Sequence, residues 1–71
     1  MAEKARRLFA KRLKQFRERR GLTQQELAER AGLDYKHLQT LEGKNPPNIT
    51  VDSVEKLAKA LSVSIPDLFR P

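Results

Sequence analysis

The chain has 71 residues, of which fifteen are Lys or Arg, nine are Asp or Glu and none is Cys, giving a formal net charge of +6. This length suits one small domain and excludes both a second domain and a large enzyme core. Because cysteine is absent, neither a disulfide framework nor a thiolate zinc site can stabilise the fold. We therefore expect stability to come from helix packing or from pairing with a second chain.

The apolar residues are too dispersed for a membrane segment. Runs such as Leu8-Phe9-Ala10 are short, whereas a membrane span needs about 20 apolar residues. The N-terminus is basic but lacks the apolar stretch of a secretory signal. The lack of cysteine also fits a reducing compartment, so we expect a cytoplasmic protein without a membrane partner.

The positive charge is concentrated at one end of the chain. Residues 1–20 hold nine Lys or Arg and two Glu, whereas residues 21–71 hold six basic and seven acidic residues. This bias favours a polyanionic partner, although a solvated, charged helix face is an alternative explanation.

Residues 3–20 have the pattern of one amphipathic helix. Apolar residues recur at helical spacing and form one stripe: Ala5, Phe9, Leu13 and Phe16. Lys and Arg fill most of the other positions. Gly21 is expected to end this helix, because glycine readily adopts the left-handed conformation found after a helix C-terminus.

Four further helix starts are predicted from cap residues. Thr23 and Glu26 have the spacing of a capping box at the start of a second helix. Asp34 and Thr50 stand where they can cap a third and a fourth helix. Ser64 is expected to cap a short fifth helix, whose first turn tolerates a proline.

The helix ends and the core follow from the same pattern. Gly32 ends the second helix, the third ends around Gly43, and the prolines at 46–47 keep the next segment a loop. No segment alternates with period two over the length of a strand, so the predicted class is all-α with five helices. The residues expected to face the core from the second to fourth helices are Leu27, Ala28, Ala31, Leu38, Leu41, Val54, Leu57, Ala58 and Leu61.

Residues 23–42 carry the most specific feature, two short helices joined by a tight turn at Gly32. Ala28 is small where two helices must approach closely, and the spacing is that of a helix-turn-helix. The chain resembles the Cro and phage-repressor family of bacterial and phage DNA-binding domains. The family pattern G-L-T-Q-x-x-L-A-x-x-x-G is met by Gly21, Leu22, Thr23, Gln24, Leu27, Ala28 and Gly32.

The resemblance covers about residues 9–69, and residues 57–68 look like the last two helices of the family. It implies a compact, five-helix, lambda-repressor-like domain, here residues 1–71, that binds double-stranded DNA. We expect no cofactor, no metal and no small-molecule effector. The chain departs from the family where its first helix starts early and where the loop carries Pro46-Pro47.

The third helix is the expected recognition helix. With Leu38 and Leu41 inward, at 100° per residue, the opposite face carries Lys36, Gln39, Thr40 and Gly43, with Tyr35 on its edge. The candidate base-reading side chains are Tyr35, Lys36, Gln39 and Thr40. Lys can donate to guanine, Gln can pair with adenine, and the two hydroxyl-bearing side chains can contact a thymine methyl in the major groove. Plain solvation of these polar side chains is the alternative.

Five residues are candidates for phosphate contacts: Gln24, His37, Lys44, Asn45 and Asn48. Gln24 lies in a first helical turn, where free backbone amides favour an anion. Lys44, Asn45 and Asn48 follow the recognition helix, where simple loop solvation is an equal alternative. His37 is the single histidine and cannot form a metal site alone, so it is expected at the core boundary or against a phosphate.

The resemblance also implies a structural pair. In the family, an arginine late in the first helix pairs with a glutamate at the end of the recognition helix, and Arg17 and Glu42 stand at the matching positions. We interpret this pair as a clamp that fixes the recognition helix. Because no nucleophile–base pair, metal cluster or complete phosphate-binding loop is evident, we expect no enzymatic activity.

The predicted function is that of a sequence-specific transcriptional regulator, associated with the nucleoid, that occupies an operator or promoter as a homodimer. Dimerisation is expected because doubled contacts raise affinity steeply. Ile65, Leu68 and Phe69 are candidates for the dimer surface, or for burial against the first helix.

An antitoxin-like or adaptor module with a protein partner is the main alternative function. Binding of the basic helix 3–20 to anionic membranes is a weaker one. If the protein binds DNA, most of the charges on that helix are expected to act as a long-range steering field, because the first helix packs behind the third.

Overall fold

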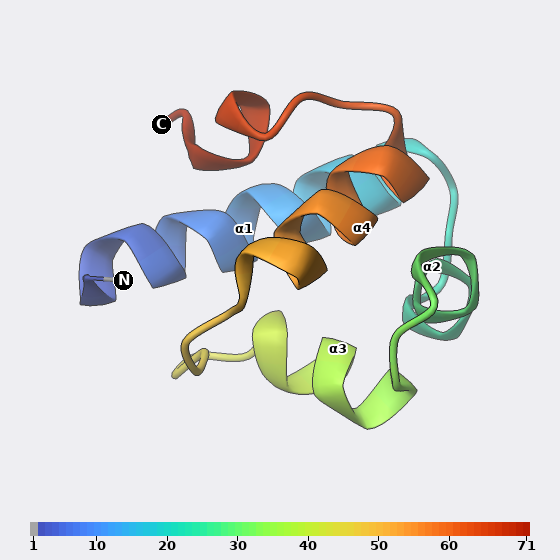
Figure 1. The fold of residues 1–71 in the computed structure, drawn as a ribbon, viewed down its shortest axis with the longest axis horizontal. Helices are drawn as coiled ribbons and strands as arrows, with labels where there is room; N and C mark the ends of the chain where they lie inside the picture. Colours follow the sequence, from blue (N-terminus) through green and yellow to red (C-terminus); the bar gives the residue numbers. More distant parts are fainter. Residues whose placement is uncertain (1) are drawn as a thin grey trace.

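The computed structural model describes residues 2–71, which form four α-helices followed by a 3-10 helix (Figure 1). The elements are α1 (Glu3–Arg19), α2 (Gln24–Ala31), α3 (Tyr35–Leu41), α4 (Val51–Leu61) and η1 (Pro66–Phe69). No strand occurs among these described residues, so the all-α prediction is confirmed. The prediction of a fifth α-helix is wrong, because η1 is a single 3-10 turn.

The last element begins where the sequence predicts but is too short to become an α-helix. The N–H of Asp67 donates to Ser64 Oγ at 3.3 Å, and the N–H of Ser64 donates to Asp67 Oδ2 at 3.0 Å. The N–H of Leu68 then donates to the carbonyl of Ile65, three residues earlier, and Arg70 is already extended. Four residues leave no room for a series of i to i+4 bonds.

η1 is anchored on α1 by its apolar side chains. Leu68 is fully buried, and the ring of Phe69 stacks on that of Phe9 with the centroids 5.3 Å apart. Of the three residues considered for a dimer surface, Ile65 alone stays exposed, at 37%. Leu68 and Phe69 therefore serve the packing of the domain itself.

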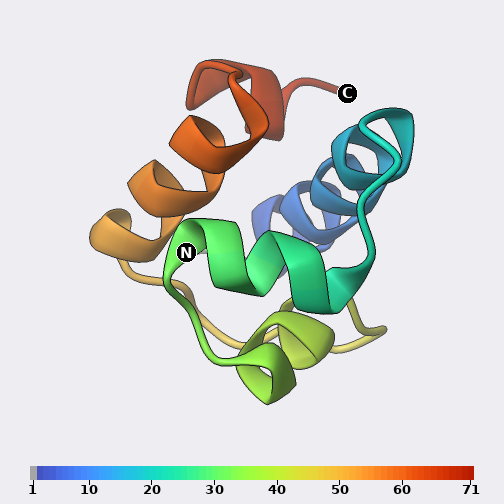
Figure 2. The same cartoon turned by 90° about the vertical axis from the view of Figure 1, so that its right-hand side faces the viewer.

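One apolar core joins the helices. η1 packs on α1, and α2 packs on both α3 and α4, with α3 and α4 on opposite sides of α2 (Figure 2). All nine residues predicted to face inward from the second to fourth helices are buried. In α1, Phe9 and Leu13 are buried, while Ala5 and Phe16, at the two ends of the apolar stripe, are half-buried.

Besides Ser64, whose bonds to Asp67 are described above, two of the predicted capping side chains, Thr23 and Thr50, form their hydrogen bonds. Thr23 Oγ1 accepts from the N–H of Glu26, whose carboxylate accepts from the N–H of Thr23, and these bonds lower the pKa of Glu26. Thr50 Oγ1 accepts from the N–H of Ser53 in the same way. The side chain of Asp34 makes no cap hydrogen bond although the residue holds the N-cap position, so that expectation is wrong.

Three helices end on a residue in the left-handed conformation. Gly21 and Gly32 have φ of +66° and +69°, as the sequence predicts for glycines after a helix. Ser62 ends α4 in the same way with φ +56°. In each case the next residue donates its backbone N–H to a carbonyl in the last turn of the helix. Leu22 donates to Arg17, Leu33 to Ala28 and Val63 to Ala58.

Ser62→Gly is therefore expected to stabilise the domain by about 0.5–1 kcal/mol, because glycine adopts this conformation without the Cβ clash that serine suffers. Urea unfolding of the parent and the variant measures the difference. Gly32→Ser is the matched control and should destabilise the domain. A lower stability for Ser62→Gly would contradict the argument.

Candidate DNA-binding interface

α3 divides its seven residues between the core and the surface. Leu38 and Leu41 are fully buried, and the four side chains assigned to base reading are all exposed: Tyr35, Lys36, Gln39 and Thr40. The helix lies at the edge of the molecule with one side against α2 (Figure 2). The four side chains thus lie on the exposed part of α3, and none belongs to the buried core.

Two hydrogen bonds orient groups on this surface. Gln39 Nε2 donates to the hydroxyl of Tyr35 at 3.0 Å, and Thr40 Oγ1 donates to the carbonyl of Lys36 at 2.9 Å. Gln39 keeps one amide N–H and its carbonyl oxygen free, which are the two groups that pair with adenine. Thr40 keeps its methyl group and its acceptor lone pairs.

Arg17 and Glu42 form a bidentate ion pair between α1 and the residue that ends α3. Arg17 Nε lies 2.8 Å from Glu42 Oε2, and Arg17 Nη2 lies 2.9 Å from Glu42 Oε1. The two side chains are only 11% and 2% exposed. The hydrogen bonds to Glu42 raise the pKa of Arg17 above its ordinary value, so the guanidinium stays charged.

Two further contacts extend this pair into a network. Arg17 Nη1 donates to the carbonyl of Leu22 at 2.8 Å, and Gln24 Nε2 donates to Glu42 Oε1 at 3.2 Å. Side chains from α1 and α2 therefore meet at the carboxylate of the residue that ends α3, and Arg17 also bonds the turn after α1. The contact from Gln24 was not foreseen from the sequence, which suggested only a phosphate contact for this residue.

The other phosphate candidates lie around the loop after α3. His37 is half-buried on α3, whereas Lys44, Asn45 and Asn48 are exposed. Asn48 Oδ1 accepts a hydrogen bond from Arg6 Nη1 at 2.6 Å, which ties the loop to the first turns of α1. Sequence reasoning missed this contact, because the two residues are 42 positions apart and neither belongs to a motif.

Among residues 2–71, no group of three or more His, Asp or Glu side chains is placed to hold a metal ion. No described helix combines the length and the apolar character needed to cross a membrane.

Comparisons with known proteins give concordant results. A model of the family described as helix-turn-helix matches residues 13–68. The transcriptional regulator SinR of Bacillus subtilis is 33% identical over 58 residues, which are 82% of this chain and 52% of SinR, and SinR of Bacillus licheniformis matches equally. The chain therefore spans about half the length of the curated relatives it matches.

Two solved structures share the fold closely. A hypothetical transcription factor, NHTF, from Neisseria superposes with a TM-score of 0.89 at 34% identity, covering 94% of this chain and 74% of that one. The restriction-modification controller protein C.AhdI from Aeromonas hydrophila gives 0.84 at 33% identity, covering 90% and 96%. Together with the family match over residues 13–68, these similarities show that the chain belongs to the helix-turn-helix family.

Proposed function

We propose that this protein is a transcriptional regulator that binds double-stranded DNA in a sequence-specific way, with α3 in the major groove. The observation that carries the proposal is the exposed face of α3, where four adjacent side chains offer hydrogen-bonding or methyl-contacting groups and none supports the core. An α-helix fits the major groove, where each base pair has its own pattern of donors and acceptors. The names of the relatives, two of which are called a transcriptional regulator and a transcription factor, support this assignment.

The backbone contacts in this proposal come from both sides of α3. Lys44, Asn45 and Asn48 stand in the loop after it, and His37 lies at its margin. Gln24 stands at the start of α2 and, although it bonds Glu42 through Nε2, keeps its second amide N–H for a phosphate. These contacts position the domain without carrying sequence information.

The proposed active form is a homodimer with one α3 in each half-site. The domain measures 27 × 22 × 20 Å between its Cα atoms. Two such domains in contact can place their recognition helices about 34–36 Å apart, one turn of DNA. Acting on DNA, the protein would work in the cytoplasm at the nucleoid and would need no catalytic step.

Selection of bound fragments from a random pool of duplex DNA tests the proposal. The expected result is enrichment of two related half-sites whose centres lie about one helical turn apart. A Lys36→Ala, Gln39→Ala variant is the control and should lose the enrichment while keeping its fold by circular dichroism. A pool that stays random would favour the adaptor or antitoxin-like alternative.

A further inference from the structure

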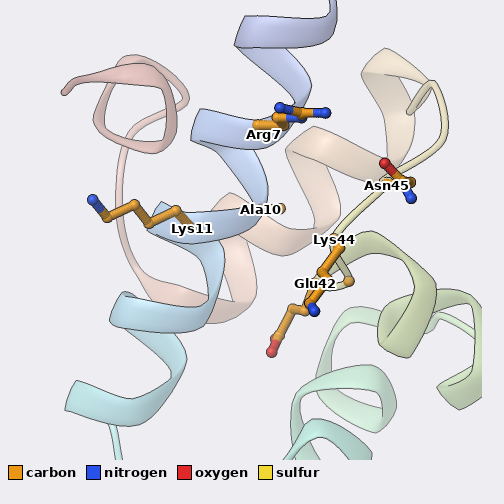
Figure 3. A pocket seen from close by; sticks show the side chains of 7 residues that line it. Arg7, Ala10, Lys11, Glu42, Lys44 and Asn45 are labelled. Carbon is orange, nitrogen blue, oxygen red and sulfur yellow. The ribbon is translucent and has the colours of Figure 1, made fainter.

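A pocket of about 540 Å³ opens between the first half of α1 and the loop that follows α3 (Figure 3). α1 contributes Arg7, Ala10 and Lys11 to its lining, and the end of α3 and the loop contribute residues 42–45. The pocket thus begins directly beyond the last residue of α3. It therefore lies between the C-terminal end of α3 and the first half of α1.

The lining of the pocket is strongly positive. Arg7 and Lys44 bring cationic side chains and Asn45 adds an amide, whereas Lys11 lines the pocket but its ammonium points away from it. The one carboxylate, that of Glu42, already accepts hydrogen bonds from Arg17 and Gln24 and is nearly fully buried. An anion in the pocket therefore meets cations and an amide, with no free carboxylate to repel it.

The two cations of α1 are placed differently. Figure 3 shows the guanidinium of Arg7 projecting toward the side of the pocket that carries Asn45, whereas the ammonium of Lys11 projects to the other side of α1. Arg7 Nη2 pairs with Glu3 Oε1 at 2.7 Å, but both side chains are well exposed, at 59% and 67%. An exposed pair of this kind is worth at most about 1 kcal/mol, so a phosphate can compete with it.

A hydrogen bond next to the pocket holds the loop after α3 against α1. Arg6 Nη1 donates to Asn48 Oδ1 at 2.6 Å, so the loop and the first turns of α1 are held against each other.

Arg7 lies outside residues 13–68, the span that the family model matches. The early start of α1 thus adds a cation beside the recognition helix that the matched part of the chain lacks.

We propose that this pocket binds one phosphate of the DNA backbone, with Arg7 and the loop residues Lys44 and Asn45 as its ligands. The inference rests on the proposed function, because it assumes that α3 lies in the major groove. It makes Arg7 an exception among the basic residues of α1, whose remaining charges act at a distance. The bound phosphate sits at the C-terminal side of α3 and fixes how far α1 tilts toward the duplex.

The experiment compares Arg7→Gln with Lys11→Gln, which remove the same charge from the same helix. The dissociation constant for the selected DNA site is measured from about 50 to 200 mM salt. Losing one phosphate contact reduces the slope of log affinity against log salt by about 0.9 per subunit. Between about 50 and 200 mM salt, the affinity of the variant should therefore fall by a factor roughly three times smaller than that of the parent. Arg7→Gln should show this change, and Lys11→Gln should change the slope by less than about a third of it.

If Arg7 and Lys44 hold the same phosphate, the effects of their substitutions on the salt slope should not add. Lys44→Gln should reduce the slope as Arg7→Gln does, and the double variant should lose clearly less than the sum, because both side chains serve one contact. Thermal melting checks that each variant folds as the parent does.

The outcomes separate this inference from the proposed function. Equal salt slopes for Arg7→Gln and Lys11→Gln, or additive effects in the double variant, would contradict phosphate binding in the pocket while the parent still binds its DNA site. A parent that shows no sequence preference would overturn the proposed function itself.

Discussion

Arg17→Ala is expected to destabilise the domain by about 2–4 kcal/mol. The substitution leaves the Glu42 carboxylate, only 2% exposed, with a single amide donor from Gln24. Removing one member of a buried pair is costly because the other charge stays desolvated without its partner. Arg17 also supplies the N–H that satisfies the Leu22 carbonyl at 2.8 Å, so the turn after α1 loses a bond as well.

Thermal and urea unfolding measure the effect. For a domain of this size, about 1 kcal/mol corresponds to roughly 4–8 °C in Tm, so the melting temperature should fall by at least about 8 °C. Arg7→Ala is the control, because its pair with Glu3 is exposed and its loss should cost at most about 1 kcal/mol. If Arg17→Ala and Glu42→Ala both melt within about 2 °C of the parent, the ion pair contributes no stability and the clamp interpretation is wrong.

Gln39→Ala is expected to weaken binding to the preferred DNA site by about 1–3 kcal/mol per half-site and to relax the preference at one base pair. The hydroxyl of Tyr35 accepts one amide N–H of Gln39 at 3.0 Å and so limits the rotation of the amide. If α3 lies in the major groove as proposed, the remaining N–H and the carbonyl oxygen of Gln39 would pair with adenine N7 and N6. Affinity for unrelated duplex should barely change.

Binding curves on the selected site, on its single-base variants and on unrelated duplex measure both parts of this prediction. Gln25→Ala is the control, because Gln25 is an exposed glutamine on α2 and should leave every base preference unchanged. Equal losses on the selected site and on unrelated duplex would show that Gln39 contacts the backbone or stabilises α3, without reading a base.

The features set by short-range chemistry could be predicted from the sequence. The capping box of Thr23 and Glu26 depends on residues three apart, and the left-handed ends at Gly21 and Gly32 depend on the one residue type that favours this conformation. The same reasoning missed the left-handed end at Ser62, because serine, unlike glycine, has no preference for this conformation.

The features set by tertiary contacts could be predicted only in part. The contact between Arg17 and Glu42 came from a resemblance, since nothing local links residues 25 positions apart. The bonds of Arg6 to Asn48 and of Gln24 to Glu42 had no sequence signal. The fifth helix was overestimated because a cap pattern marks where a helix begins but does not show how soon the chain must turn away to cover α1.

The seven residues of α3 divide between packing in the core and the proposed contacts with DNA. Leu38 and Leu41 join the core, whereas none of the four proposed reading residues belongs to it. If α3 reads DNA as proposed, exchanging the outward residues would change which DNA site is preferred without altering how the domain packs. Duplicated copies of such a gene could then acquire new binding sites by a few substitutions on one helix face, while the core residues of the fold stay the same.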